Sequence, residues 1–243
     1  MSEAWNGFRV EEFLFEDKPA RIIFPEEGKA IGRLALKTLY KDAFPNAVEL
    51  DLLKKGFHLC FVTNEHRWGA ETDLDRMARF VQFVTQKHGL QKRIVPIGMS
   101  AGGLLAILLA AKYPESISCL YLDAPVLNYL SCPGCLGDGR REDSAIVLEE
   151  VYRAIPAKNM SQLIAYRDAP LDKLPILLQY KIPVVLVAGL ADRIVPYHEN
   201  GQILQNAYEQ ASVDFQCHLK PGCDHHPHGV EDNEQVIQFI MTH

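Results

Sequence analysis

The sequence predicts an α/β protein with a mostly parallel, twisted sheet that helices cover on both faces. Short apolar runs rich in β-branched residues alternate along the chain with segments in which apolar residues recur at helical spacing. That alternation is typical of parallel strands joined by helical crossovers. A length of 243 residues and a hydrophobic content of 48% suffice for one core, so we expect a single domain over residues 1–243.

Six strands and six helices are expected in alternation. The strand candidates are residues 20–24, 57–62, 93–97, 117–122, 183–187 and 215–219. The helix candidates are residues 34–43, 74–87, 103–112, 145–154, 201–210 and 233–241. Residues 125–181 interrupt this rhythm with a Gly- and Cys-rich loop, a charged run and helical pieces. We expect this segment to be a cap insertion over the carboxyl ends of the strands, where open α/β sheets bind ligands.

Composition excludes several classes of protein. The formal net charge of -6 gives no field that would attract nucleic acid or an anionic membrane surface. The first ten residues lack the basic start and apolar run of a signal peptide, and the longest apolar run is too short to span a bilayer. We therefore expect a cytoplasmic protein with a small-molecule partner. Six cysteines are few for this length, and a disulfide framework is not expected.

A candidate nucleophile follows the third expected strand. Residues 98–103 read Gly-Met-Ser-Ala-Gly-Gly and run directly into an apolar helical segment. A strand, a sharp glycine-rich turn and a helix present a serine hydroxyl above the sheet, which is the arrangement of a nucleophile elbow. Ser100 is then the nucleophile, and the backbone N–H of Ala101 at the start of the helix supplies one donor of an oxyanion hole.

A candidate acid follows the fifth expected strand. Asp192 stands in the loop after residues 183–187, where a carboxylate can accept a histidine ring N–H and fix its tautomer. An alternative role for this aspartate is to cap a helix. Asp123 is the rival acid, because it follows residues 117–122 at the same edge of the sheet.

The candidate base lies in the loop after the last expected strand, where three histidines occur: His225, His226 and His228. His225 is preferred because a short turn after Gly222 would carry its ring back over the elbow, and His226 would then point away. His228 is expected to support the loop or to touch substrate. A metal site is also conceivable, but adjacent residues rarely bind one ion well, so no metal or other cofactor is expected.

The remaining candidates have weaker support. The second oxyanion donor is expected from the loop after the first strand, at Glu26 or Glu27. Trp68 is a possible substrate-binding residue at the pocket mouth, with an ordinary packed tryptophan as the alternative. Cys132 and Cys135 form a CxxC motif without a second ligand pair, which favours a plain loop over a zinc site.

Together, the elbow at 98–103, the acid loop at 189–196 and the loop at 222–229 resemble the α/β-hydrolase superfamily over nearly the whole chain. Shorter segments resemble a bacterial group of prolyl-oligopeptidase-like and carbohydrate-ester serine hydrolases: 42–45, 55–57, 87–90, 123–125 and 225–229. That group usually carries Arg after the nucleophile, where this chain has Ala101, so a substrate contact through that arginine is not expected. The resemblance implies an α/β-hydrolase fold and carboxylic ester hydrolysis without a cofactor.

Three functions follow from these observations. The first is a serine esterase that cleaves a carbohydrate or other small-molecule ester through an acyl-enzyme on Ser100. The second is a serine peptidase that acts on short peptides with the same three residues. The third is a noncatalytic binding protein that keeps the fold as a ligand pocket.

Overall fold

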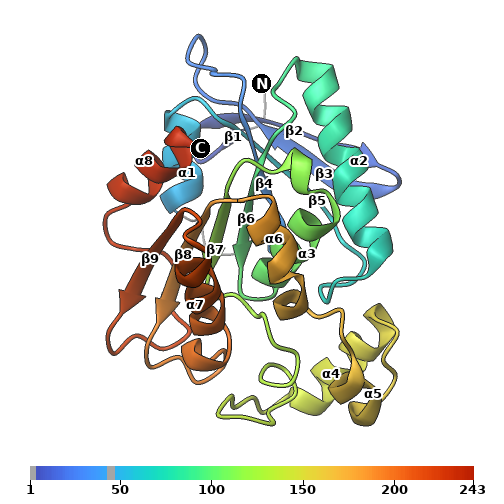
Figure 1. The fold of residues 1–243 in the computed structure, drawn as a ribbon. Helices are drawn as coiled ribbons and strands as arrows, with labels where there is room; N and C mark the ends of the chain where they lie inside the picture. The colour runs from blue at the N-terminus through green and yellow to red at the C-terminus, as the bar shows by residue number, and fades with distance from the viewer. Residues whose placement is uncertain (1–3, 43–46) are drawn as a thin grey trace.

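The computed structural model describes residues 4–42 and 47–243. Within these residues the strands form one nine-stranded sheet in the order β1-β2-β3-β5-β4-β6-β7-β8-β9 (Figure 1). From β5 to β9 neighbouring strands are parallel, whereas β1, β2 and β3 pair antiparallel with one another and β3 with β5. The strands are β1 (Ala4–Trp5), β2 (Phe8–Phe15), β3 (Lys18–Ile23), β4 (Leu34–Lys37), β5 (His58–Val62), β6 (Val95–Met99), β7 (Leu120–Asp123), β8 (Val184–Gly189) and β9 (Phe215–Lys220). The predicted fold class is confirmed.

All six predicted strands are present, as β3 and β5 to β9. The helix predicted over 34–43 is wrong: Leu34–Lys37 is strand β4, which lies between β5 and β6, and Ala43 lies outside the described residues. All four residues of β4 are buried, and a short apolar run that is buried on both faces has no alternation to distinguish it from a helix. The DAFP segment at 42–45 also lies mostly outside the described residues.

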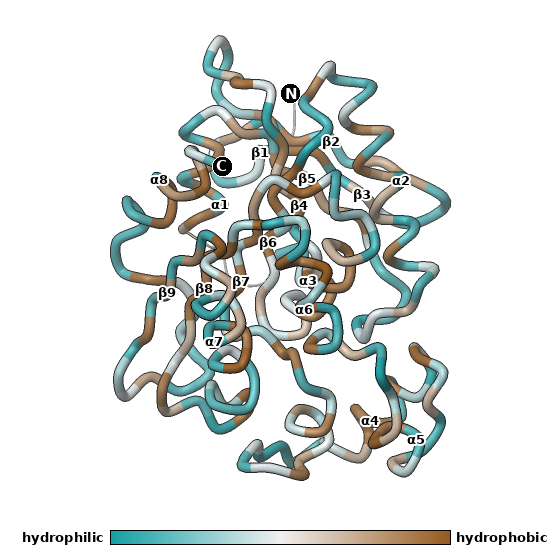
Figure 2. The backbone as a smooth tube through the Cα atoms, in the orientation of Figure 1, coloured by the Kyte–Doolittle hydropathy of each residue, from teal (hydrophilic) through white to brown (hydrophobic). Residues whose placement is uncertain are grey.

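Helices cover both faces of the sheet. On one face α2 (Glu71–His88), α3 (Ala101–Lys112), α6 (Leu174–Gln179) and α7 (Gly201–Ala211) follow one another, and on the other α1 (Ala47–Lys54) packs beside α8 (Glu234–Thr242). Figure 2 shows hydrophobic residues concentrated along the central strands and α3. Helix α3 has no polar face, since Ala101 to Ala111 are all buried. This central helix begins immediately after Ser100 and therefore holds the elbow rigidly.

The segment 125–181 contains helices and no strand. Helix α6 and the short 3-10 helix at Pro170–Lys173 pack against α3 and so belong to the helical layer on the sheet. Helices α4 (Ser144–Ala154) and α5 (Met160–Ala165) extend beyond the sheet, on the side to which the parallel strands point (Figure 1). This part of the segment forms the cap. Across the described ranges, no helix combines the length and apolar character that crossing a bilayer requires.

Candidate active site

Ser100 occupies a strained turn between β6 and α3. Its backbone has φ 53° and ψ -123°, a positive-φ conformation that residues other than glycine rarely adopt. Its neighbours must be small: a Cβ on Gly98 would lie 2.6 Å from the Gly102 oxygen, and one on Gly103 would lie 2.4 Å from Pro125 Cβ. The glycines of the motif therefore allow the close contact of strand, turn and helix that raises the serine above the sheet.

The structure brings His225 onto Ser100. The His225 Nε2 atom lies 3.1 Å from Ser100 Oγ, although the two residues are 125 positions apart in sequence. The histidine side chain is only 7% exposed. At this distance the serine hydroxyl can donate to the ring nitrogen, which is the contact that a general base needs.

Asp192 binds the other nitrogen of the same ring. Its Oδ2 lies 2.7 Å from His225 Nδ1, so the ring donates this proton and keeps the lone pair of Nε2 for the serine. The Oδ1 atom accepts from the backbone N–H groups of Ile194 and Val195 at 2.9 and 2.8 Å. These bonds hold the buried carboxylate in its turn, which is not the first turn of a helix.

Asp123, the rival acid, binds His228 instead of His225. Its Oδ1 lies 3.0 Å from His228 Nδ1, and its Oδ2 accepts from the Gly229 backbone at 2.5 Å and the Tyr121 hydroxyl at 3.2 Å. The His228 side chain is only 4% exposed. His228 therefore supports the loop through Nδ1, and the alternative expectation of a substrate contact stays a prediction.

The two expected oxyanion donors lie at opposite edges of the sheet. The Ala101 N–H is the first of helix α3, next to Ser100, and has no earlier carbonyl within the helix to bind. Glu26 follows β3, which runs antiparallel to β5, and so it lies beside the amino ends of the parallel strands. The expectation for Glu26, and for its alternative Glu27, is wrong because the strand before them has the opposite direction.

A better second donor lies after β4. This strand is parallel to β6, so its end carries Thr38 and Leu39 to the elbow. A Cβ on Gly102 would lie 3.7 Å from the Leu39 nitrogen, and within the described ranges that N–H has no hydrogen-bond partner. The Thr38 hydroxyl lies 2.8 Å from the Gly102 carbonyl and 3.1 Å from that of Ile97, which ties this loop to the elbow. Leu39 could not be singled out from the sequence, because residues 34–43 were expected to be a helix and not a strand followed by a loop.

A surface ion pair connects the acid loop to the histidine loop. Asp224 accepts from the Arg193 backbone at 3.0 Å, from the Arg193 guanidinium at 2.9 and 2.7 Å, and from the His225 backbone at 2.8 Å. The Arg193 backbone and guanidinium contacts, followed by the His225 N–H, lower the pKa of Asp224 to about 2. This pair fixes the backbone on both sides of the Asp192–His225 contact.

Two further residues are placed by the structure. Trp68 is 1% exposed and its Nε1 donates to Glu150 of the cap at 2.9 Å, so it packs in the interior beside the cap, and a substrate contact stays a prediction. His226 does not point away, since its ring centroid lies 5.0 Å from that of His225. All six cysteines, including Cys132 and Cys135, are free thiols.

A pocket of about 450 Å³ adjoins the elbow. It is lined by Leu39, Asn64, Glu65, His66, Arg67, Trp68, Glu150 and Arg153. A pocket of about 640 Å³ includes Ile94 and Ile117 and another of about 650 Å³ includes Phe24 to Gly28, so both lie toward the amino ends of the parallel strands. The 450 Å³ pocket is the candidate binding site because Leu39, one of its lining residues, lies next to Gly102 of the elbow.

Comparisons with known proteins agree with this geometry. Residues 56–133 match the family described as alpha/beta hydrolase fold. The acylamino-acid-releasing enzymes of mouse and rat are 29% and 30% identical over 170 residues, which is 67% of this chain and 22% of each relative. The chain thus spans less than a quarter of the length of these relatives.

Solved structures of peptidases share the fold. Dipeptidyl peptidase 4 of Porphyromonas gingivalis matches with a TM-score of 0.69 at 17% identity, over 97% of this chain and 35% of that one. The acylaminoacyl peptidase of Pyrococcus horikoshii matches with a TM-score of 0.66 at 15% identity, over 90% and 37%.

The fold and the placement of Ser100 together define the structural class of this chain. The sheet order, the strained serine between β6 and α3, and the match of residues 56–133 identify the fold of this chain as the α/β-hydrolase fold.

Proposed function

We propose that Ser100, His225 and Asp192 form a catalytic triad that cleaves acylated amino acids or short acylated peptides. The observation that carries the proposal is the continuous hydrogen-bonded line from Ser100 Oγ through the His225 ring to Asp192, with contacts of 3.1 and 2.7 Å. Peptidase cleavage was the second function expected from the sequence, and the similarity to acylamino-acid-releasing enzymes now favours it over ester cleavage.

The reaction proceeds through an acyl-enzyme. Ser100 Oγ attacks the substrate carbonyl carbon while its proton passes to His225 Nε2, and Asp192 stabilises the resulting imidazolium. The carbonyl oxygen becomes an oxyanion that accepts hydrogen bonds from the N–H groups of Ala101 and Leu39. The leaving amine takes the proton from His225, and water then hydrolyses the acyl group from Ser100 by the same steps. The reaction needs no cofactor.

The charges in the pocket beside Leu39 favour an acylated substrate over one with a free amine. Glu150 already accepts from Arg67 at 2.7 Å and Trp68 at 2.9 Å, and Glu65 lies 3.4 Å from the Lys18 ammonium. Arg153 lines the same pocket and has no hydrogen-bond or ion-pair partner within the described ranges. A wall with paired carboxylates and an available guanidinium suits carbonyl and carboxylate acceptors, not an ammonium group.

The test compares three chromogenic substrates: N-acetyl-alanine p-nitroanilide, alanine p-nitroanilide and p-nitrophenyl acetate. We expect kcat/KM for the acetylated amide to exceed that for the free amine by about tenfold or more, which corresponds to about 1.4 kcal/mol of transition-state binding. Arg153→Gln should remove this preference, and Glu149→Gln on the same helix should keep it. Turnover of the ester alone would instead establish the esterase that the sequence analysis placed first.

Two broader expectations remain part of the proposal. The partner is a small molecule and not nucleic acid or a membrane, in keeping with the net charge of -6. A cytoplasmic location also remains a proposal, and fractionation of cells that express the full protein tests it.

A further inference from the structure

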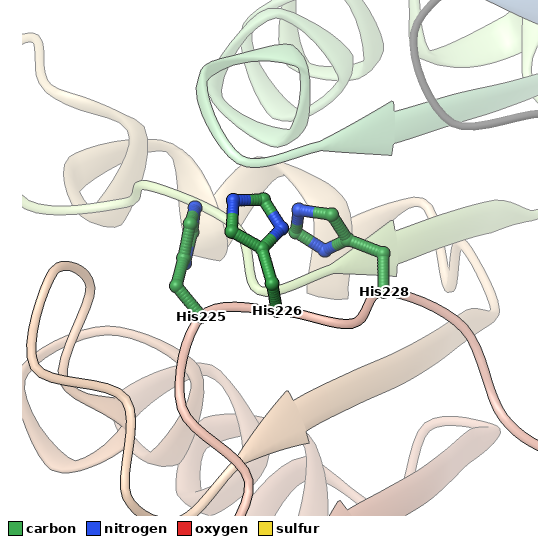
Figure 3. Close-up of side chains that lie close together, drawn as sticks. All are labelled: His225, His226 and His228. Carbon is green, nitrogen blue, oxygen red and sulfur yellow. The ribbon is translucent and has the colours of Figure 1, made fainter.

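Three histidines of one loop lie close together beside Ser100. The ring centroids of His225, His226 and His228 are 5.0, 5.1 and 4.7 Å apart, and the rings meet edge to face (Figure 3). One nitrogen of each ring lies within 4.8 Å of the others. Adjacent residues rarely bind one ion well, and for this reason no metal was expected from the sequence. Here, however, the loop folds back and brings three imidazoles close together.

Buried carboxylates orient two of these rings. His225 Nδ1 donates to Asp192 at 2.7 Å, and His228 Nδ1 donates to Asp123 at 3.0 Å. The two carboxylate side chains are each 1% exposed. A histidine that donates Nδ1–H to a carboxylate presents the lone pair of Nε2, and this pairing is the usual outer shell of a zinc-binding histidine.

His226 completes the cluster from the solvent side. Its residue is exposed, while its ring packs against the other two.

We propose that His225, His226 and His228 form an inhibitory site for Zn²⁺ or a similar divalent transition metal ion. Imidazole nitrogens in a tetrahedral zinc site lie about 3.3 Å apart for Zn–N bonds of about 2.05 Å. The three nitrogens here lie within 4.8 Å of one another, so side-chain rotations that move each nitrogen by about 1 Å or less would bring them to that separation. The ion would take the Nε2 lone pair of His225 that otherwise receives the Ser100 proton. The inhibition rests on the proposed triad, whereas the binding of the metal does not.

Binding is measured first, without substrate. Isothermal titration of the purified full chain with ZnCl₂ should show one site, and His226→Gln should weaken its Kd by about tenfold or more. His243→Gln, which removes an imidazole near the C-terminus, should leave the Kd unchanged. Ser100→Ala should bind zinc at least as tightly as the wild type, because no hydroxyl then competes for His225 Nε2.

Spectroscopy identifies the metal ligands, and fluorophosphonate labelling shows whether the bound metal inhibits Ser100. Co²⁺ should give the visible bands of a nitrogen and oxygen site without a thiolate-to-cobalt charge-transfer band, which excludes nearby Cys223 as a ligand. Zinc should slow labelling by a fluorophosphonate in the wild type and much less in His226→Gln, whose labelling without zinc should match that of the wild type.

Two results would overturn the site. One is an equal Kd for the wild type and His226→Gln, and the other is a thiolate band that disappears in Cys223→Ser. Zinc binding that depends on His226 but leaves fluorophosphonate labelling unaffected would keep the site and reject its inhibitory role. A wild type that binds zinc but is never labelled would count against the proposed triad and not against the metal site.

Discussion

At the residue scale, the site contains two buried aspartates that each hold a histidine, but only one of these histidines touches the serine. Asp192 binds His225, which lies 3.1 Å from Ser100 Oγ, and Asp123 binds His228. The sequence left both aspartates open as the acid, because both follow strands that end at the same edge of the sheet. The hydrogen bonds assign the triad contact to Asp192 and a loop-supporting contact to Asp123.

This assignment predicts unequal effects of two matched substitutions. Asp192→Asn should lower kcat by about 10³-fold to 10⁴-fold, because an amide no longer selects the tautomer in which His225 Nε2 accepts the serine proton. Asp123→Asn should lower kcat by about tenfold or less, since the Asp123 carboxylate supports His228 and Gly229 of the histidine loop and does not contact the ring that touches Ser100. Steady-state kinetics on p-nitrophenyl acetate measure both. Equal losses, or a larger loss for Asp123→Asn, would reject the assignment.

Asp224 predicts a contribution to stability that depends on pH. Its folded-state pKa of about 2 lies below the ordinary value of 3.8, so the folded state binds this proton less readily than the unfolded state. The contribution is therefore complete above pH 4 and is lost as the pH falls from about 4 to about 2. Thermal unfolding of Asp224→Asn should show a lower Tm at pH 5 and a smaller fall between pH 4 and pH 2 than the wild type. The exposed Asp17→Asn variant is the control, and a pH profile of Asp224→Asn equal to the wild type would contradict the role.

At the element scale, the direction of a strand decides which loops reach the site. The loops after β4, β6, β7, β8 and β9 meet at one edge because these strands are parallel. The loop after β3 leaves from the other edge, and Glu26 with it. Strand β4 thus places the Leu39 N–H near Gly102 of the elbow, where we propose that it complements the Ala101 N–H.

The sequence predicted the positions of Ser100, Asp192 and His225 because each follows a strand with strong apolar and β-branched character. The sequence could not predict that Leu39 lies in a loop at the elbow. The four residues of β4 are all buried and show no alternation of apolar and polar residues, and the residues that follow also fit a helix. The contacts of Asp123 and Arg193 were missed for another reason: each joins loops more than 30 positions apart, and such pairing has no local signature.

The role of the β4 loop predicts that Thr38→Val lowers kcat by about tenfold with little change in KM. The substitution keeps the shape of the side chain but removes the hydroxyl that binds the Gly102 carbonyl at 2.8 Å, so Leu39 N–H is held less firmly toward the oxyanion. Thr63→Val is the matched control, because its hydroxyl binds the Pro19 carbonyl at 2.9 Å after the neighbouring strand β5. Steady-state kinetics test both, and an unchanged kcat in Thr38→Val would remove the loop from the mechanism.

At the scale of the whole molecule, the cap joins the core through buried apolar residues of α4 and α5 and through a few polar contacts. Glu150 of α4 accepts from the buried Trp68 indole and from Arg67, and the Tyr129 hydroxyl donates to the Trp68 carbonyl at 2.8 Å. These contacts place one wall of the pocket relative to Leu39. Helix α4 contributes Glu150 and Arg153 to that pocket.

Glu150→Ala should therefore weaken the attachment of the cap. The Trp68 N–H would remain buried without an acceptor, which costs about 1–3 kcal/mol of unfolding free energy. Denaturant unfolding should show this loss, and limited proteolysis should cleave α4 or α5 faster. Glu149→Ala, on the exposed side of the same helix, should leave both measurements unchanged. Equal behaviour of the two variants would contradict the anchoring role.

The measurement that tests the account most directly is labelling with a fluorophosphonate, followed by peptide mass spectrometry, on the wild type, Ser100→Ala and His225→Ala. We predict a single adduct on Ser100 in the wild type, no adduct in Ser100→Ala, and labelling slowed by about 10³-fold or more in His225→Ala. A wild type that stays unlabelled, or an adduct on another residue, would contradict the claim that Ser100 is an activated nucleophile.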